Sequence, residues 1–377
     1  MGEDVNSKKR GLVIVYDPHN LYQFIWYYCN AGKDLNWDAL CLPNDKRGEY
    51  MHPYCEATGI FDEVYKYDDG FKSADVKKKF ITFAEMLAYY VTGQKKRFCK
   101  KLINRYVNWD EYDQIVILTS VGLVSGACAA LSDEKDIVIL EDGGSDYLER
   151  KKWLGWENIK SSYQWQGFLL SHMGYCCPGW FYFKPEKNCV KYSSRPDKMN
   201  GCNYKEIRQL YDSIGTDHRL MESIVKKTYP QIEEIDFKEV DAVFLSIPLS
   251  DHVNEVEKYK NKLENYLSGK YNKILMKKHP RDEMDYSFGK TALIYADKSI
   301  PAEVFMPYLK NVDVYMCESC STVMYAKAYD LRCFVLILDG YYEDSMAEGV
   351  GTKALSEEDV RAYVDEFGGS RCSIVKI

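Results

Sequence analysis

Residues 115–140 have the sequence IVILTSVGLVSGACAALSDEKDIVIL, with a short apolar run at each end. The runs at 115–118 and 137–140 contain only Ile, Val and Leu, and the lack of polar alternation is typical of strands buried on both faces. Small residues after the first run lead into an alanine-rich segment, which predicts a tight turn followed by a helix. Strand, helix and strand in this order predict two central strands of a parallel sheet.

The same alternation of short apolar runs and longer helical patterns extends over most of the chain. In the first half it predicts strands at 12–16, 39–42, 115–118 and 137–140, with helices at 21–29 and 80–91. In the second half it predicts strands at 242–245, 273–276, 292–295, 312–316 and 334–338, with helices at 255–267, 301–308 and 322–329. Two such series predict an α/β fold of two Rossmann-like domains that bind a ligand at the carboxyl ends of their strands.

The middle of the chain separates the two series. Residues 151–185 are irregular and rich in aromatic side chains, and residues 204–229 have a helical pattern that ends near Pro230. A chain of 377 residues exceeds the roughly 250–300 residues at which single cores stop growing. We therefore predict a first domain at 1–235, which includes the aromatic and helical connection, and a second domain at 236–377.

The composition excludes several classes of protein. A chain with 46% hydrophobic and 28% charged residues is globular, and a net charge of −7 argues against nucleic acid as a partner. The sequence has no phosphate-binding loop of the Gly-x-x-x-x-Gly-Lys-Ser/Thr type and no Gly-x-Gly-x-x-Gly after the first strand. The polar segment 1–10 leads into an apolar run too short for a signal peptide or a membrane span, so we expect a cytoplasmic protein.

Cysteine usage also bears on the class of protein. The 13 cysteines are scattered through a large core-forming chain, which favours reduced and mostly buried thiols over a disulfide framework. The Cys-x-x-Cys at 317–320 lacks a second ligand pair, and the adjacent cysteines at 176–177 lack a partnering His motif. We therefore predict no metal site.

The first segment with chemical potential is Glu141-Asp142-Gly143-Gly144, which directly follows the apolar run at 137–140. The carboxyl end of a parallel strand opens into the ligand crevice, and glycines allow a sharp turn and a close approach by substrate. A carboxylate placed there can accept the proton of an acceptor hydroxyl as it attacks a sugar. An acidic turn after a strand is also common in proteins of other function, so this segment is weak evidence alone.

The second segment is KKHPR at 277–281, which directly follows the run at 273–276. An imidazole among cationic neighbours at a strand end fits a phosphate, and His279 could stabilise the charge on a departing nucleotide. A solvated basic turn is the alternative. A second His-Pro pair, His52-Pro53, follows no apolar strand and is not included.

The third segment is ESCST at 318–322, after the run at 312–316 and at the start of a predicted helix. Hydroxyl groups and the free N–H groups of a helix start form an anion site, although simple capping of the helix explains Ser and Thr equally well. All three polar segments fall at the ends of predicted parallel strands. Their common placement favours one functional site over three independent coincidences.

The order and spacing of these segments resemble the motifs of bacterial sialyltransferases. EDG at 141–143, HP at 279–280 and ST at 321–322 are similar to their acidic-acidic-Gly, His-Pro and paired Ser/Thr motifs. FLSIPLSD at 244–251 looks like the strand that opens the second domain of glycosyltransferase family 52, and YDPHNLY at 16–22 is similar to that family's start. The resemblance covers nearly the whole chain.

The resemblance implies a GT-B fold, with two Rossmann-like domains facing across a cleft, and metal-independent, inverting transfer from CMP-sialic acid. The acceptor would be a terminal galactoside of a lipooligosaccharide or capsular glycan, bound by the first domain, and the second domain would bind the nucleotide-sugar donor. Asp142 would be the base, with Asp251 as the alternative base, and His279 would be the phosphate partner or acid. The donor-binding residues would be Gly143, Lys278, Pro280, Arg281, Glu318, Ser319, Ser321 and Thr322.

Other interpretations remain open from the sequence. Family 52 includes members that resemble transferases of other sugars, so a GT-B enzyme with a UDP-sugar donor is the nearest alternative, and a non-catalytic glycan-assembly protein is another. The Ser-Thr pair departs from the family's two serines, and the aromatic segment 151–185 matches nothing in the family, which leaves the acceptor open. The resemblance is compatible with a homodimer, and with peripheral association at the inner face of a membrane through a lipid-linked acceptor.

Overall fold

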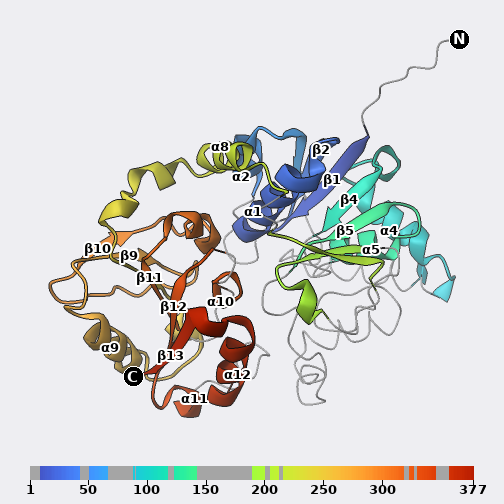
Figure 1. Ribbon diagram of the computed structural model, residues 1–377. Helices are drawn as coiled ribbons and strands as arrows, with labels where there is room; N and C mark the ends of the chain where they lie inside the picture. Colours follow the sequence, from blue (N-terminus) through green and yellow to red (C-terminus); the bar gives the residue numbers. More distant parts are fainter. Residues whose placement is uncertain are drawn as a thin grey trace, which may run out of the picture. The chain divides into compact units, whose positions relative to one another are not determined.

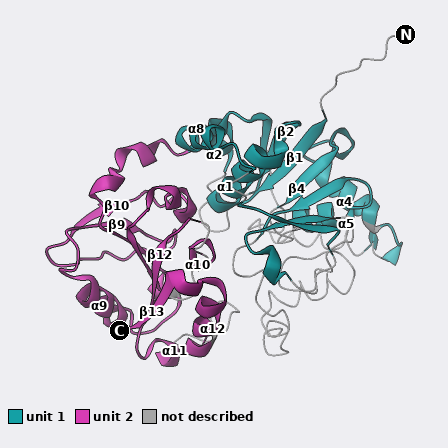
Figure 2. Cartoon of the chain, in the orientation of Figure 1, with its two compact units in different colours: residues 1–228 teal, residues 229–377 magenta. Residues whose placement is uncertain are grey.

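The computed structural model has two compact units, residues 1–228 and residues 229–377 (Figure 2). The structure describes residues 9–42, 51–66, 88–89, 91–117, 123–141, 189–199, 204–211, 215–317, 322–326, 329–344 and 356–377. Each unit is built around its own parallel sheet (Figure 1). The predicted domain boundary after residue 235 falls in the connection that follows the helix α8 (His218–Thr228).

The sheet of unit 1 is parallel throughout, in the order β3-β2-β1-β4-β5-β6-β7. Its strands are β1 (Arg10–Val15), β2 (Asn36–Cys41), β3 (Phe61–Lys66), β4 (Gln114–Ile117), β5 (Asp136–Ile139), β6 (Val190–Ser193) and β7 (Glu206–Gln209). The apolar runs that begin at 115 and 137 supply β4 and β5, and both strands lie inside the sheet, as predicted. Residues 115–117 and 137–139 are buried, as expected for strands inside a parallel sheet.

The helices of unit 1 are α1 (Pro18–Tyr27), continued by the π-helix η1 (Tyr28–Gly32), then α2 (His52–Thr58), α4 (Lys95–Ile103), α5 (Leu123–Ala130) and α8, with short 3₁₀ turns η2 (Trp109–Glu111) and η5 (Pro196–Lys198). Asp17 caps α1 by accepting from the N–H of Asn20 at 2.9 Å. Pro18 occupies the first turn of α1, where its missing N–H costs no hydrogen bond. Side chains of α4 and α5 pack with Leu12 and Ile115 on one face of the sheet.

The sheet of unit 2 is also parallel, in the order β10-β9-β8-β11-β12-β13. Its strands are β8 (Ala242–Leu245), β9 (Lys273–Lys277), β10 (Ala292–Tyr295), β11 (Asp313–Cys317), β12 (Arg332–Ile337) and β13 (Cys372–Lys376). In chain order within the unit this is 3-2-1-4-5-6, the order of the Rossmann fold. The strand order reverses between β8 and β11, and ligands of such sheets bind at the carboxyl ends next to the reversal.

The helices of unit 2 are α9 (Val256–Leu267), α10 (Thr322–Tyr325), α11 (Tyr341–Asp344) and α12 (Glu357–Phe367). The short 3₁₀ helices are η6 (Pro230–Glu234), η7 (Phe237–Glu239), η8 (Leu249–Asp251), η9 (Ala302–Val304), η10 (Met306–Tyr308) and η11 (Gly369–Arg371). Tyr259, Leu263 and Leu267 recur on one side of α9 and are fully buried against the sheet. Figure 1 shows α12 on the other side of the sheet from α9.

The structure corrects one of the predicted helices. The helical pattern predicted at 204–229 contains the strand β7 and, further on, α8, because the residues of β7 pair in register with β6 and add a strand to the sheet. The helix predicted at 322–329 begins as α10, and the N–H of Tyr329 donates to the carbonyl of Tyr325 at 3.0 Å, while residues 327–328 lie outside the described residues. The predicted helix at 80–91 lies almost wholly outside the described residues.

The described part of the chain bears on two general expectations, the burial of the cysteines and the lack of a membrane-spanning segment. The structure buries eight of the nine cysteines that it describes, as predicted, and only Cys372 is partly exposed. In the same ranges, no helix combines the length and the apolar character needed to cross a bilayer.

Candidate functional site

The candidate site lies at the carboxyl ends of β8 and β9, which are neighbours in the sheet of unit 2. Ser246 directly follows β8, and the predicted segment with His279 directly follows β9. Neighbouring parallel strands end at the same edge of the sheet, so the two loops meet there. The loop after β11, residues 318–321, carries part of the third predicted segment and lies outside the described residues.

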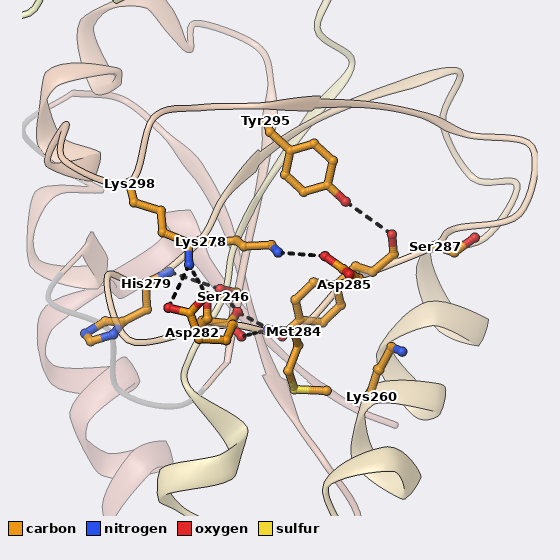
Figure 3. A network of polar contacts seen from close by, with 12 residues as sticks. Ser246, Lys260, Lys278, His279, Asp282, Met284, Asp285, Ser287, Tyr295 and Lys298 are labelled. Atoms are coloured by element: carbon orange, nitrogen blue, oxygen red, sulfur yellow. Dashed lines mark hydrogen bonds and ion pairs between the residues drawn. The ribbon is translucent and has the colours of Figure 1, made fainter.

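The turn from His279 to Asp282 is anchored on Ser246 (Figure 3). The N–H of Asp282 donates to the carbonyl of His279 at 2.8 Å and closes the turn. The backbone N–H of His279 donates to Oγ of Ser246 at 3.1 Å, and the Ser246 hydroxyl is hydrogen-bonded to the carboxylate of Asp282. One side chain from the end of β8 therefore binds both ends of the turn.

The His279 ring is held in one tautomer. The backbone N–H of Arg281 donates to Nδ1 at 3.2 Å, so the proton of the neutral ring is on Nε2. Burial, and then the positive charges of Arg281 and Lys277, lower the pKa of His279 to about 4. At neutral pH the ring is an uncharged N–H donor. No described residue hydrogen-bonds to Nε2, and the ring points away from Ser246 and Asp282 (Figure 3).

Lysine side chains surround the turn. Lys277 is 5% exposed, and its Nζ donates to the carbonyls of Lys278 at 2.8 Å and Lys298 at 3.1 Å. Burial lowers the pKa of Lys277 to about 8, against the opposing effects of Glu303 and Asp297. The ammonium group therefore stays mostly charged at pH 7. A buried positive charge beside a neutral N–H donor favours an anionic ligand.

Lys278 follows Lys277 in the same segment, and its side chain is 11% exposed. Its Nζ lies 3.4 Å from a carboxylate oxygen of Asp285 and 5.3 Å from the ring centre of Tyr295. Asp285 is 99% exposed, so this ion pair contributes little to stability. The ammonium group of Lys278 can therefore exchange that partner for a phosphate at small cost.

The structure brings some of the predicted residues together. Lys278, His279, Pro280 and Arg281 occupy one turn, and Asp251 ends η8, the short helix after β8, at the same edge of the sheet. Thr322 begins α10 in the next loop of that edge and is 1% exposed. The predicted residues Asp142, Gly143, Glu318, Ser319 and Ser321 lie outside the described residues.

The acidic segment of unit 1 is described only at its first residue. Glu141 is fully buried, and its carboxylate accepts from the backbone N–H of Ser194 at 2.6 Å. Lys191, also buried, donates to the carbonyl of Leu140 at 2.9 Å. These contacts tie the end of β5 to β6, so Glu141 serves the fold.

Sequence reasoning missed the residues that support the turn. Ser246, Asp282 and Lys298 were given no role, although Ser246 directly follows the predicted strand at 242–245 and Asp282 directly follows KKHPR. A hydroxyl and a carboxylate beside a functional motif are a weak signal, because their contact depends on a long-range pairing of strands. Among the described residues, no group of three or more His, Cys, Asp or Glu could hold a metal ion.

The low pKa of His279 predicts a pH dependence of stability. Between its unfolded pKa of 6.5 and its folded pKa of about 4, the unfolded chain binds a proton that the folded chain does not. The free energy of unfolding therefore falls as the pH is lowered through this window, by up to about 3 kcal/mol. Urea unfolding of wild type and His279→Gln at pH 7 and pH 4.5 measures the difference. An equal loss in both proteins would contradict the buried neutral ring.

Two solved structures share this fold over nearly the whole chain. The glycotransferase of kitacinnamycin matches with a TM-score of 0.50 and 10% sequence identity, covering 97% of this chain and 86% of the other. The Arabidopsis thaliana protein UGT89C1, solved with UDP-L-rhamnose, matches with a TM-score of 0.51 and 10% identity, covering 98% of this chain and 86% of the other. No family model matches the sequence, and no curated protein matches it significantly. The predicted fold class, α/β with two Rossmann-like units of the GT-B type, is confirmed.

Proposed function

We propose that this protein is a glycosyltransferase that binds a nucleotide-sugar donor at the carboxyl ends of β8 and β9 in unit 2. The observation that carries the proposal is His279, a neutral ring fixed with its proton on Nε2, at the carboxyl edge of the sheet, which is the edge at which Rossmann folds bind nucleotides. Charged Lys277 lies beside it. An N–H donor near a positive charge suits a phosphate oxygen.

The chemistry that follows is an inverting transfer. A base takes the proton of the acceptor hydroxyl, the hydroxyl oxygen forms a bond with the anomeric carbon, and the bond from that carbon to the donor phosphate breaks. Negative charge then grows on the phosphate, where Nε2–H of His279 stabilises it more in the transition state than in the ground state. Because this ring is neutral in the free protein, its part is hydrogen bonding, and full proton donation would first require a rise in its pKa.

The other roles come from the sequence motifs. Asp142 is the proposed base and Asp251 the alternative, and the hydroxyls of Ser321 and Thr322 are proposed phosphate ligands. Transfer is proposed to need no metal ion, with the charge of the leaving group met by the His279 turn. The proposed acceptor is a terminal sugar of a bacterial surface glycan.

For the donor, a UDP-sugar is the leading candidate. The fold similarity to UGT89C1, a protein solved with UDP-L-rhamnose, supports it. CMP-sialic acid is the second candidate, because HP at 279–280 and ST at 321–322 resemble sialyltransferase motifs.

A panel of nucleotides tests the proposal and separates the two donors. We expect UDP to raise the melting temperature and CMP, GDP and ADP to leave it near the control value. A ligand at 100 times its Kd adds about 2.7 kcal/mol, which corresponds to a shift of roughly 5–10 °C for a unit of this size. The measurement is a thermal shift assay in EDTA.

The outcomes of the panel are distinct. A shift with CMP alone would favour the sialyltransferase. Stabilisation by no nucleotide would contradict the proposed function. Binding of UDP without turnover of any UDP-sugar would favour a non-catalytic glycan-assembly protein.

A further inference from the structure

Asp282 is a buried carboxylate beside His279, and both of its oxygens are hydrogen-bonded. It is 0% exposed. Oδ1 accepts from the backbone N–H of Met284 at 3.0 Å, and Oδ2 accepts from the hydroxyl of Tyr286 at 3.1 Å and is also bonded to Ser246. Both oxygens of this carboxylate are already occupied by hydrogen bonds within the protein, so its place beside His279 needs an explanation other than substrate binding.

Ser246 connects this carboxylate to the candidate phosphate ligand. Its oxygen accepts the backbone N–H of His279 at 3.1 Å, so its own proton is directed at Oδ2 of Asp282. The carboxylate thus fixes the orientation of the hydroxyl, and the hydroxyl fixes the backbone of His279. The Tyr286 hydroxyl is a second polar neighbour of Ser246, and it too is held in place by Oδ2 of Asp282.

The loop after β10 also holds this turn. Nζ of Lys298 donates to the backbone carbonyl of Asp282 at 2.6 Å, and the carbonyl of Lys298 accepts from Nζ of Lys277 at 3.1 Å. Figure 3 shows the side chain of Lys298 reaching Asp282 close to Ser246. Both ends of the turn are therefore fixed by groups outside β9.

We infer that Ser246 and Asp282 are positioning residues that hold the 279–282 turn in the shape in which the Arg281 N–H reaches Nδ1 of His279. This contact leaves the ring proton on Nε2, where the donor phosphate is proposed to bind. The inference rests on the proposed function for its consequence in catalysis, but the state of the ring can be measured without any ligand.

The test compares the His279 ring in wild type and variants by NMR of protein labelled with ¹⁵N-histidine. Wild type is expected to show the single tautomer with the proton on Nε2 throughout pH 6–8. Ser246→Ala removes the acceptor of the His279 N–H and is expected to give a mixture of tautomers and a ring that titrates closer to pH 6.5. Ser246→Thr keeps the hydroxyl and is expected to restore the wild-type spectrum.

Ser299→Ala is the matched control. The hydroxyl of Ser299 also donates to a carboxylate, that of Asp297 at 2.7 Å, but does not contact the 279–282 turn. Its removal is expected to leave the His279 signals unchanged. Asp282→Asn is expected to change the His279 signals as Ser246→Ala does. If Asp282→Asn fails to fold, the spectra of Ser246→Ala and Ser246→Thr still test the inference.

Binding of UDP gives the second readout. We expect Ser246→Ala to raise the Kd for UDP at least about tenfold by calorimetry, which corresponds to the loss of one hydrogen bond to a charged group. A wild-type tautomer and titration in Ser246→Ala would overturn the inference. A wild-type protein that binds no nucleotide would contradict the proposed function instead, and the NMR comparison would still decide the positioning.

Discussion

Replacing His279 by alanine is expected to lower the rate of donor turnover by roughly 10²–10³-fold, the usual effect of removing one hydrogen-bond donor from a developing negative charge. The loss should appear mainly in kcat, because Nε2–H binds the phosphate most strongly when the bond to the sugar breaks. The measurement is release of nucleotide from the donor that the panel selects. His279→Gln, which retains an N–H donor, is expected to recover part of the rate.

The chain provides a matched control for this substitution. His52 also precedes a proline, but it begins α2 in unit 1 and lies 3.2 Å from the carboxylate of Glu56. His52→Ala changes the same residue type in the same dipeptide and is expected to leave kcat within about twofold of wild type. Equal losses in both variants would mean that the effect arises from general damage, and an unchanged rate in His279→Ala would refute the role of the turn.

Replacing Gly11 by alanine is expected to destabilise unit 1 by at least about 2–3 kcal/mol, the cost of forcing an extra methyl into a packed core. A Cβ at Gly11 would lie 2.4 Å from the ring of Trp37 on the neighbouring strand. The indole cannot move aside easily, because it is 1% exposed and its Nε1 donates to the carbonyl of Gly32 at 2.7 Å. Its ring also packs edge-on against Phe24 at 5.0 Å.

Gly32→Ala is the control for this effect. A Cβ there would meet its nearest neighbour, a ring carbon of Tyr27, at 3.4 Å, which is an ordinary contact. The free energy of unfolding, measured in urea, is expected to change by less than about 1 kcal/mol. The double variant Gly11→Ala/Trp37→Leu should lose less stability than the two single variants together, because the added methyl no longer meets the indole ring. Additive losses would show that Trp37 is not the cause.

Most interior strands could be predicted from the sequence, because strands buried on both faces have unbroken apolar runs. The interior strand β6 lacks such a run and has no predicted counterpart. The predicted strand at 242–245 coincides with β8, and the predicted strand at 273–276 lies within β9. Of the edge strands, β10 coincides with the predicted strand at 292–295, but β3, β7 and β13 have no predicted counterpart. Among the described strands, β7 pairs only with β6, and it carries exposed charged side chains, Glu206 and Arg208, so its composition resembles that of a solvated helix.

In the candidate site, too, some residues could be predicted from the sequence and others could not. The segment KKHPR was visible because cationic residues and a histidine directly follow an apolar strand. Ser246 and Asp282 were not, because they lie 36 positions apart and meet only through the pairing of β8 with β9. Neither residue has a local signature that distinguishes a positioning contact from an ordinary turn.

The sequence by itself determined the α/β class, the two series of strands and helices, and the presence of a histidine at a strand end. These properties follow from local periodicity, which depends on neighbours along the chain. Only the tertiary structure decided the strand order, the tautomer and low pKa of His279, and the network that holds its turn. Those depend on burial and on contacts between distant segments, which arise when the sheet assembles.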